Sequence, residues 1–317
     1  MNDRFPDAWP ELPYEAWRET LATLHLWTQI VGKVRLALSP WLNHSWHATL
    51  YPTARGLSTG LIPHGRRGFS LEFDFVRHLL LASVVDGPGF EMRLAPRTVA
   101  SFHAELLDGL DGLGLPVRIH GYPNEVPDSL PFAEDETHAS YDADYARRFW
   151  RALLDIHRVF TWFRAGFRGK VSPVHLFWGS FDLAVTRFSG RRAPLHPGGV
   201  PNLPDRVTRE AYSHEVSSVG FWPGNEMVPY PAFYAYAYPA PEGFARAAVE
   251  PVGAAWNEEL GEYLLPYETV RRSADPEAVL RRFLETTYAV AADLAAWDRE
   301  DLECSREAPT DAEWNLA

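Results

Sequence analysis

The sequence predicts an α+β fold of two similar halves, each an antiparallel sheet with long helices packed on one face. Three observations predict this class. Helical periodicity and strand-like alternation occupy separate stretches, the order helix, strands, helix occurs twice, and apolar residues make up 46% of the 317 residues, enough for a packed core. The expected organisation is a first half over 1–120, a linker over 121–140, a second half with a C-terminal helix over 141–300, and an acidic tail over 301–317.

The first half begins with a predicted helix. Pro13 precedes a run in which apolar side chains recur every three or four residues. These positions are Tyr14, Trp17, Leu21, Leu24, Thr28 and Val31. Short β-rich runs with turn signals between residues 46 and 94 predict antiparallel strands, a second helix is expected at about 98–113, and a short strand over 117–120.

The second half follows a proline-rich, acidic stretch. Residues 141–167 carry one apolar face and predict a long helix. Four β-rich runs come next: PVHLFW, FDLAVTRF, YSHEVSSVGF and FYAYAY. The final helix is expected to start with Asp275 as its N-cap and Pro276 as its first residue.

The repeated order suggests an internal duplication. Adding 132 to the number of His25 gives His157, so the two long helices align on a histidine of their apolar faces. Adding 143 maps Phe69 onto Tyr212 in the strand region. The alternative is one α+β domain in which the same rhythm occurs twice by coincidence.

Charge and cysteine content exclude several classes of protein. The formal charge of -12 disfavours binding to nucleic acid or to an anionic membrane surface. Cys304 is the only cysteine, so no intrachain disulfide or thiolate zinc cluster can form. Neither a signal peptide nor an apolar run of about 20 residues is present. We expect a soluble cytoplasmic protein, and leave its metals, cofactors and oligomeric state open.

Motifs of well-known enzymes are also missing. The sequence has no zinc-protease helix motif, no phosphate-binding lysine loop, no glycine-rich dinucleotide fingerprint and no nucleophile elbow. What remains are histidines and carboxylates at equivalent positions. Two facing halves would bring His25 and His157 to a shared cleft, where Glu72 and Glu215 on strands could complete a metal site. The alternative for each histidine is a core position bonded to a backbone carbonyl.

The stretch from His175 to Arg192 carries the first candidate site. Asp182 lies on the less apolar face of a strand, where it acts as a general base or pairs with Arg187. Trp178 begins a Trp-Gly-Ser turn in which a small residue lets a ligand or another backbone approach.

The next strand carries the second candidate. His214 falls where the first repeat has an apolar residue, which makes the pair of His214 and Glu215 the preferred functional pair. Adjacent strand residues point to opposite faces, so the two share a site only across a bulge. Tyr234 and Tyr236 either line a cavity or cover a neighbouring helix.

Several long strings resemble a bacterial family of uncharacterised proteins, a domain-of-unknown-function family. They are WPELPYEAWRETLATLHLWTQIVGKVRLALSPW, HLFWGSFDLAVTRFSG and SHEVSSVGFWPGN. The resemblance extends from Trp9 to about Trp297 and implies a bacterial, cytoplasmic protein. It implies no activity, cofactor or catalytic residue.

Two hypotheses follow. The first is a small-molecule enzyme, hydrolytic or metal-assisted, with a cleft between the halves. Its catalytic candidates are His175, Asp182, His214 and Glu215, and its ligand-binding candidates are Trp178, Arg187, Trp222, Tyr234 and Tyr236. The second is a non-catalytic ligand-binding or scaffold protein that uses the aromatic strand surface.

Overall fold

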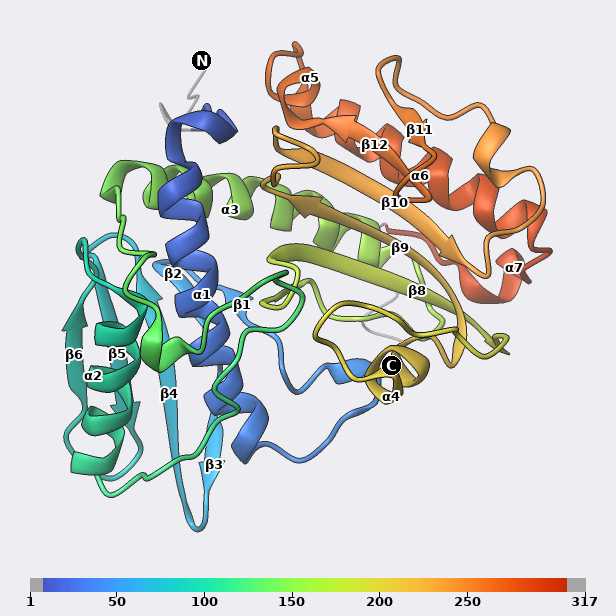
Figure 1. The fold of residues 1–317 in the computed structure, drawn as a ribbon. Coiled ribbons are helices and arrows are strands. Elements are labelled where there is room, and N and C mark those ends of the chain that lie inside the picture. Colours follow the sequence, from blue (N-terminus) through green and yellow to red (C-terminus); the bar gives the residue numbers. More distant parts are fainter. Residues whose placement is uncertain (1–7, 307–317) are drawn as a thin grey trace, which may run out of the picture.

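The computed structural model describes residues 8–306 (Figure 1). The helices of this region are α1 (Tyr14–Leu38), α2 (Val99–Gly112), α3 (Ala143–Ala165), α4 (Asp205–Ala211), α5 (Tyr267–Arg271), α6 (Pro276–Leu294) and α7 (Arg299–Leu302). Three short 3₁₀ turns are η1 (Asn43–Ser45), η2 (Phe132–Glu134) and η3 (Phe244–Arg246). These helices and two antiparallel sheets confirm the α+β class.

The first sheet belongs to the N-terminal half. Its strands are β1 (Tyr51–Pro52), β2 (Gly56–Ser58), β3 (Ile62–His64), β4 (Arg67–Asp74), β5 (Leu79–Val84) and β6 (Phe90–Arg93). They are arranged β1-β2-β4-β5-β6, with β3 also paired to β4. Helices α1 and α2 pack on this sheet through aromatic side chains, since Trp27 of α1 stacks on Phe102 of α2 at 4.7 Å and Phe102 stacks on Phe73 of β4.

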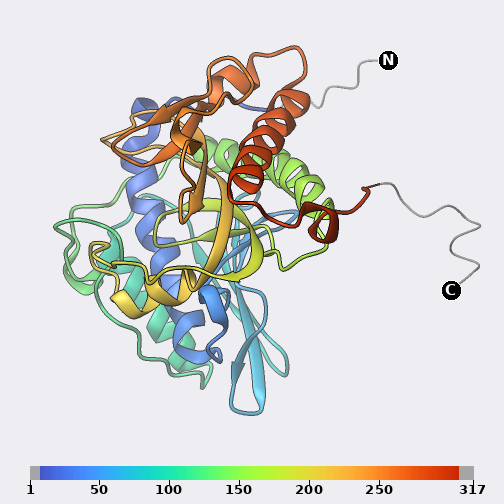
Figure 2. The same cartoon turned by 90° about the vertical axis from the view of Figure 1, so that its right-hand side faces the viewer.

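The second sheet belongs to the C-terminal half. Its strands are β7 (His175–Phe177), β8 (Asp182–Arg192), β9 (His214–Trp222), β10 (Ala232–Tyr238), β11 (Ala255–Asn257) and β12 (Glu262–Pro266), in the order β11-β12-β10-β9-β8-β7. Helices α3 and α6 lie side by side on one face of it (Figure 2). The N-cap of α6 is the predicted one, because the Asp275 side chain accepts a hydrogen bond from the Ala278 amide.

The two halves meet at the edges of their sheets. Leu50 and Leu176 form an antiparallel bridge with backbone hydrogen bonds of 2.8 and 2.9 Å, and it connects the β1 edge to the β7 edge. Helix α1 crosses this junction and packs against both α2 and α3. A single contiguous hydrophobic core therefore extends through both halves.

The offset of 143 does not relate the two sheets. It maps β4 onto β9 and β6 onto β10, but β4 and β6 are separated by β5, whereas β9 and β10 are hydrogen-bonded neighbours. A fixed offset cannot turn separated strands into neighbours, so the sequence matches that suggested it are not structural equivalents.

Other predictions have mixed outcomes. The predicted helices correspond to α1, α2, α3 and α6, while residues 117–120 form no strand. The proposed linker contains η2 and the fully buried Phe132, so part of it belongs to the core. The predicted acidic tail is described only to residue 306, and 307–317 lie outside the described residues. No helix in the described part combines the length and apolarity needed to cross a bilayer.

Candidate functional site

The face of the second sheet opposite α3 and α6 carries a group of polar side chains. Alternation along each strand places them on this face, and the strand register brings them side by side. They are Asp182 and Thr186 of β8, Ser218 of β9, Tyr234 and Tyr236 of β10, and Glu262 of β12. The Thr186 and Ser218 hydroxyls are 2.8 Å apart. A sheet face that is polar and yet covered is unusual, since each buried polar group needs a partner.

Asp182 is the centre of this group. It is the first residue of β8, directly after the turn over 178–181, and its side chain is only 6% exposed. The Ser180 hydroxyl donates to one carboxylate oxygen and the Tyr234 hydroxyl donates to the other. Burial raises the pKa of Asp182, and the two donors oppose that rise by stabilising the ionised form.

Gly220 allows Tyr234 to reach Asp182. Tyr234 of β10 is paired with Gly220 of β9. Gly220 is in turn paired with Ala184 of β8, which lies two residues beyond Asp182. A Cβ atom added at position 220 would overlap the phenol carbon and hydroxyl of Tyr234. The ring therefore lies across β9 only because that position has no side chain. Burial holds the pKa of Tyr234 well above its ordinary value, so the phenol stays a donor.

Two glutamates face Asp182 from other elements. Glu262 comes from β12, and Glu125 comes from a loop between the halves. Burial, with the Asp182 charge as the second cause, raises the pKa of Glu125 to about 7 and that of Glu262 to about 8. Neither carboxyl has a hydrogen-bond or ion-pair partner among the described residues. The protonation of both glutamates therefore depends on the charge of Asp182.

Tyrosines form the remaining wall. The rings of Tyr234 and Tyr236 stack with their centroids 6.0 Å apart, and the Tyr236 hydroxyl is 2.9 Å from that of Tyr212, which follows α4. Trp222 packs beside them. Burial raises the pKa of Tyr236 to about 12. At neutral pH the wall presents protonated hydroxyls and aromatic faces.

Residues 121–131, which we call the flap, carry Glu125 to this face. Gln29 of α1 clamps the flap, because its amide donates to the Asn124 carbonyl and accepts from the Asn124 N–H, both at 2.8 Å. Lys33, one turn further along α1, donates to the Asn124 side-chain oxygen. In Figure 1 the flap is the green segment that crosses α1 between α2 and α3.

His25 lies on the same face of α1, four residues before Gln29. Its Nε2 atom is 2.9 Å from the carbonyl oxygens of Trp178 and Gly179, to which it donates. Burial lowers the pKa of His25 to about 4 and that of Lys33 to about 8. His25 is therefore neutral at pH 7 and fixes the turn that leads to Asp182.

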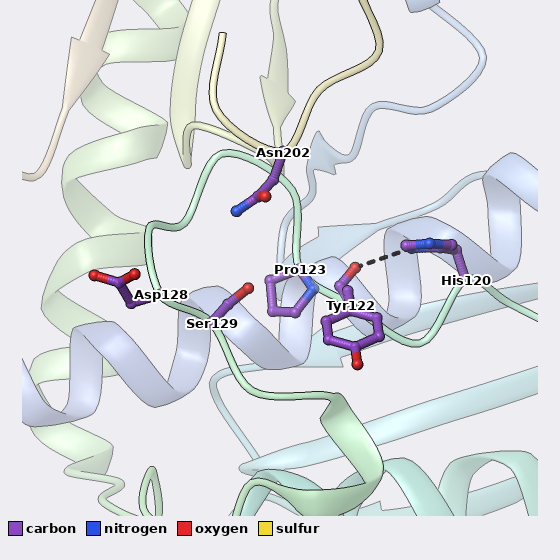
Figure 3. A pocket seen from close by; sticks show the side chains of 6 residues that line it. All are labelled: His120, Tyr122, Pro123, Asp128, Ser129 and Asn202. Atoms are coloured by element: carbon purple, nitrogen blue, oxygen red, sulfur yellow. Dashed lines mark hydrogen bonds between the residues drawn. The ribbon is translucent and has the colours of Figure 1, made fainter.

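An open cavity of about 480 Å³ lies next to the flap. Its lining residues are His120, Tyr122, Pro123, Asp128, Ser129 and Asn202. Figure 3 shows the flap passing beside Asn202, which belongs to the loop before α4. Asp182, Glu125 and Glu262 are not among these lining residues.

Comparison with protein families covers nearly all of this architecture. The model of a family of unknown function, DUF5996, matches residues 9–304. The chain belongs to the DUF5996 family. Neither the search of curated proteins nor that of solved structures finds a match.

The structure does not bring the predicted catalytic residues together. In this DUF5996 chain His214 begins β9, whereas Asp182 adjoins the pair of Leu183 and Phe221. Positions 214 and 221 are seven residues apart, or roughly 20 Å along a strand. Glu215 lies on the α6 side, where its carboxylate is 2.7 Å from Arg191. His214 and Glu215 point to opposite faces and neither reaches Asp182.

His175 has a separate environment. It is fully buried, and its ring is surrounded by Trp46, Tyr51 and Phe177 with centroid distances of 6.4, 6.1 and 4.7 Å. Neither ring nitrogen has a hydrogen-bond partner in the described structure. Burial lowers the pKa of His175 to about 3, so it is neutral. It contributes no proton transfer to Asp182 in this arrangement.

The interpretation of Asp182 and Arg187 as an ion pair is wrong. Five positions apart on one strand, they point to opposite faces, and Arg187 is buried between α3 and α6. Its guanidinium lies 3.6 Å from the Phe163 ring centroid and donates to the Phe163 carbonyl. Trp178 packs on Gly32 and donates to the Ala48 carbonyl, which makes it an anchor for the turn.

The histidines of the two long helices also lie apart. The nearest polar partner of His157 is the Thr161 hydroxyl at 3.5 Å on its own helix, whereas His25 contacts the turn before β8. Within residues 8–306, no three or more His, Cys, Asp or Glu side chains form a group able to hold a metal ion. The hypothesis of a shared His site between two repeats loses its geometric basis.

Glu125, Glu262 and Gly220 were not predicted as site residues. Glu125 stands between prolines in the sequence PNEVP, which was interpreted as a linker. Glu262 starts a short strand that was not predicted. For Glu262 the local signal is a carboxylate beside apolar strand residues, and many surface positions share that signal.

Proposed function

We propose that this protein is an enzyme that acts on a small polar molecule by general acid–base catalysis at Asp182. One observation carries the proposal: a buried carboxylate is held by Ser180 and Tyr234, and two further carboxyls face it without any cationic partner from the described residues. Such a set is unfavourable for stability and useful for moving protons.

The three carboxyls can take different roles. Asp182, with two hydroxyl donors, is the one most stabilised as an anion and serves as the base that activates water. Glu125 and Glu262 keep their protons up to about pH 7 and 8 and serve as acids toward a leaving group. A base and an acid in one site support hydrolysis, in which water gives a proton to Asp182 and the leaving group accepts one from a glutamic acid.

The same residues indicate a substrate class. Carboxylates accept hydrogen bonds from hydroxyl and amine groups, while the stacked faces of Tyr234 and Tyr236 suit the apolar side of a ring or short chain. We therefore propose a neutral or cationic substrate that carries hydroxyl or amino groups. An anionic substrate would meet three carboxyls.

A non-catalytic binding protein is the second candidate. The stacked tyrosines, with Trp222 beside them, form an aromatic surface that can hold a ligand without chemistry. In that case the carboxyls only select the ligand. We further propose, from composition and family resemblance, a bacterial protein of the cytoplasm that does not bind nucleic acid.

A thermal-shift screen with hydroxylated and amino compounds tests the proposal. A ligand that binds the folded state raises the Tm of the wild type. Asp182→Asn should reduce the turnover of that compound by about 10²–10⁴-fold, as expected for loss of a general base. Asp111→Asn, at an exposed carboxylate of α2, is the matched control and should behave like wild type. A ligand that binds without being converted supports the binding protein instead. Unchanged turnover in Asp182→Asn would refute catalysis at this residue.

A further inference from the structure

The flap has the build of a hinged loop. Its two ends are tied together, because the Phe132 amide donates to the Gly121 carbonyl at 2.8 Å. Phe132 is fully buried and anchors this closure point in the core. Compact loops with joined ends move as units and are often functional. A movement of the flap about Gly121 and Phe132 would leave this closure point in place.

Polar contacts hold the flap down. Besides Gln29 and Lys33, the loop before α4 holds the flap through two hydrogen bonds. The Asn124 side chain donates to the Asn202 carbonyl at 2.6 Å, and the Asn202 side chain donates to the Val126 carbonyl at 2.7 Å. Both Glu125 and Asn202 adopt positive φ angles, at 60° and 54°. Segments held by a few hydrogen bonds near the surface open at low free-energy cost.

In the closed flap the Glu125 carboxyl is buried and feels the negative charge of Asp182. This carboxyl lies so close to the Gly179 backbone that a Cβ atom there would overlap it. The charge of Asp182 on β8 acts on Glu125, and the charge of Glu125 acts on Tyr212, which follows α4. The other titratable groups of these elements are Glu262 of β12, which also senses Asp182, His25 and Lys33 of α1, and Asp128 on the flap itself. The Lys33 ammonium is bound to Asn124, and His25 is neutral.

We propose that the flap is a proton-operated gate to the Asp182 site, closed when Glu125 is protonated and opened when Glu125 ionises. The identity of this site as a catalytic centre rests on the proposed function, whereas the gate itself rests on the contacts of the flap. Opening moves an ionised Glu125 away from Asp182 into water, and the two hydrogen bonds between the flap and Asn202 break at the same time. Substrate access is therefore coupled to the protonation of a group that also acts in the site.

The size of the effect follows from linkage. In the closed state the pKa of Glu125 is raised from 4.5 to about 7, and an open flap returns it to the ordinary value. A protonated carboxyl favours closure, so closure is strongest below about pH 4.5 and weakens as pH rises to about 7. The open-to-closed ratio should increase about tenfold per pH unit within that window, and roughly fiftyfold between about pH 5 and 7.5.

Amide hydrogen exchange of the ligand-free protein tests the gate. Protection of the flap, and of the Asn124 amide in particular, is measured from pH 5 to 7.5 and corrected for intrinsic rates, with amides of β4 as the reference for global opening. We expect a roughly fiftyfold loss of flap protection with rising pH in the wild type. Glu125→Gln should keep the flap protected and remove the pH dependence, and Glu134→Gln, at an exposed site just after the flap, should match the wild type.

Asn202→Ala provides the second perturbation. It removes the hydrogen bond from the Asn202 side chain to the Val126 carbonyl, while the Asn202 backbone carbonyl still accepts from Asn124. Flap protection should fall at every pH while the slope with pH remains. A pH-independent flap in the wild type, or the same slope in Glu125→Gln, would overturn the gate. Because exchange is measured without substrate, a chain that lacks the proposed activity can still show the gate, and an active enzyme can still lack it.

Discussion

Gly220→Ala is the sharpest test of how the site is built. The added methyl group would occupy the space of the Tyr234 phenol, so the ring must leave its position across β9 and release Asp182. The lost hydrogen bond to a charged group contributes about 1.5–3 kcal/mol, and overpacking adds about 1–3 kcal/mol. Alanine gains about 0.5–1 kcal/mol over glycine in a strand. We expect a net destabilisation of about 3 kcal/mol.

Urea and thermal unfolding measure this change. A loss of about 3 kcal/mol lowers the Tm of a chain of this size by about 5 °C. Gly112→Ala is the matched control: it lies at the end of α2 with open space around an added Cβ atom, so the same chemical change should leave stability equal or slightly higher. The stability change of Gly220→Ala is then compared with that of Gly112→Ala, where the added Cβ atom contacts no other residue.

A double-mutant cycle isolates the hydrogen bond. Tyr234→Phe removes the hydroxyl without a clash and should destabilise by about 1.5–3 kcal/mol. In the Gly220→Ala background the bond is already lost, so the second change should add little. Additive effects of the two changes, or a Gly220→Ala protein as stable as the wild type, would refute the placement of Tyr234.

Three further predictions concern the carboxyls and His175. Glu262→Gln should flatten the decline of stability between pH 4.5 and about 8. The pKa of Glu262 is raised in the folded state, so its contribution to stability is greatest below pH 4.5 and falls as pH rises. Urea unfolding at several pH values would show no flattening if Glu262 were solvated. Asp182→Asn should lower the pKa values of Glu125 and Glu262 by removing a neighbouring negative charge, and carbon NMR titration of the glutamate carboxyls would contradict this by showing them unmoved. His175→Leu should match or exceed the wild-type stability and keep full activity, because an apolar side chain replaces a buried imidazole with no described partner. A loss of turnover at unchanged stability would restore His175 as a catalytic candidate.

The sequence allowed prediction of the elements whose signals are local. The helical periods of α1 and α3 and the capping residue of α6 depend on neighbours a few positions away, and those predictions were confirmed. The alternation in β8 also placed Asp182 on the face opposite Leu183. Each of these features can be stated from one short stretch of sequence.

The site itself depends on contacts distant in sequence. The Asp182 charge acts on Glu125 because α1 and the Asn202 loop position the flap, and Asp182 contacts Tyr234 because a glycine lies on the strand between them. Neither relation follows from spacing along the chain. The preference for His214 arose from an assumed equivalence with Leu71, and that equivalence fails because the strand orders differ.

The two faces of the second sheet show why its polar side calls for a function. On the α3 side the buried charge of Arg187 is surrounded by aromatic rings and a carbonyl acceptor, so its burial is compensated. On the other side Glu125 and Glu262 have no such partners among the described residues, and their pKa values rise instead. Apolar side chains at these two positions would fill the same layer at lower free energy. A Glu125→Gln, Glu262→Gln double variant should therefore be more stable than the wild type at pH 8 and equal to it near pH 4, where both carboxyls are protonated in either state. If that gain in stability comes with loss of turnover, the carboxyls are present for chemistry; if turnover survives, the flap and the sheet face serve binding alone.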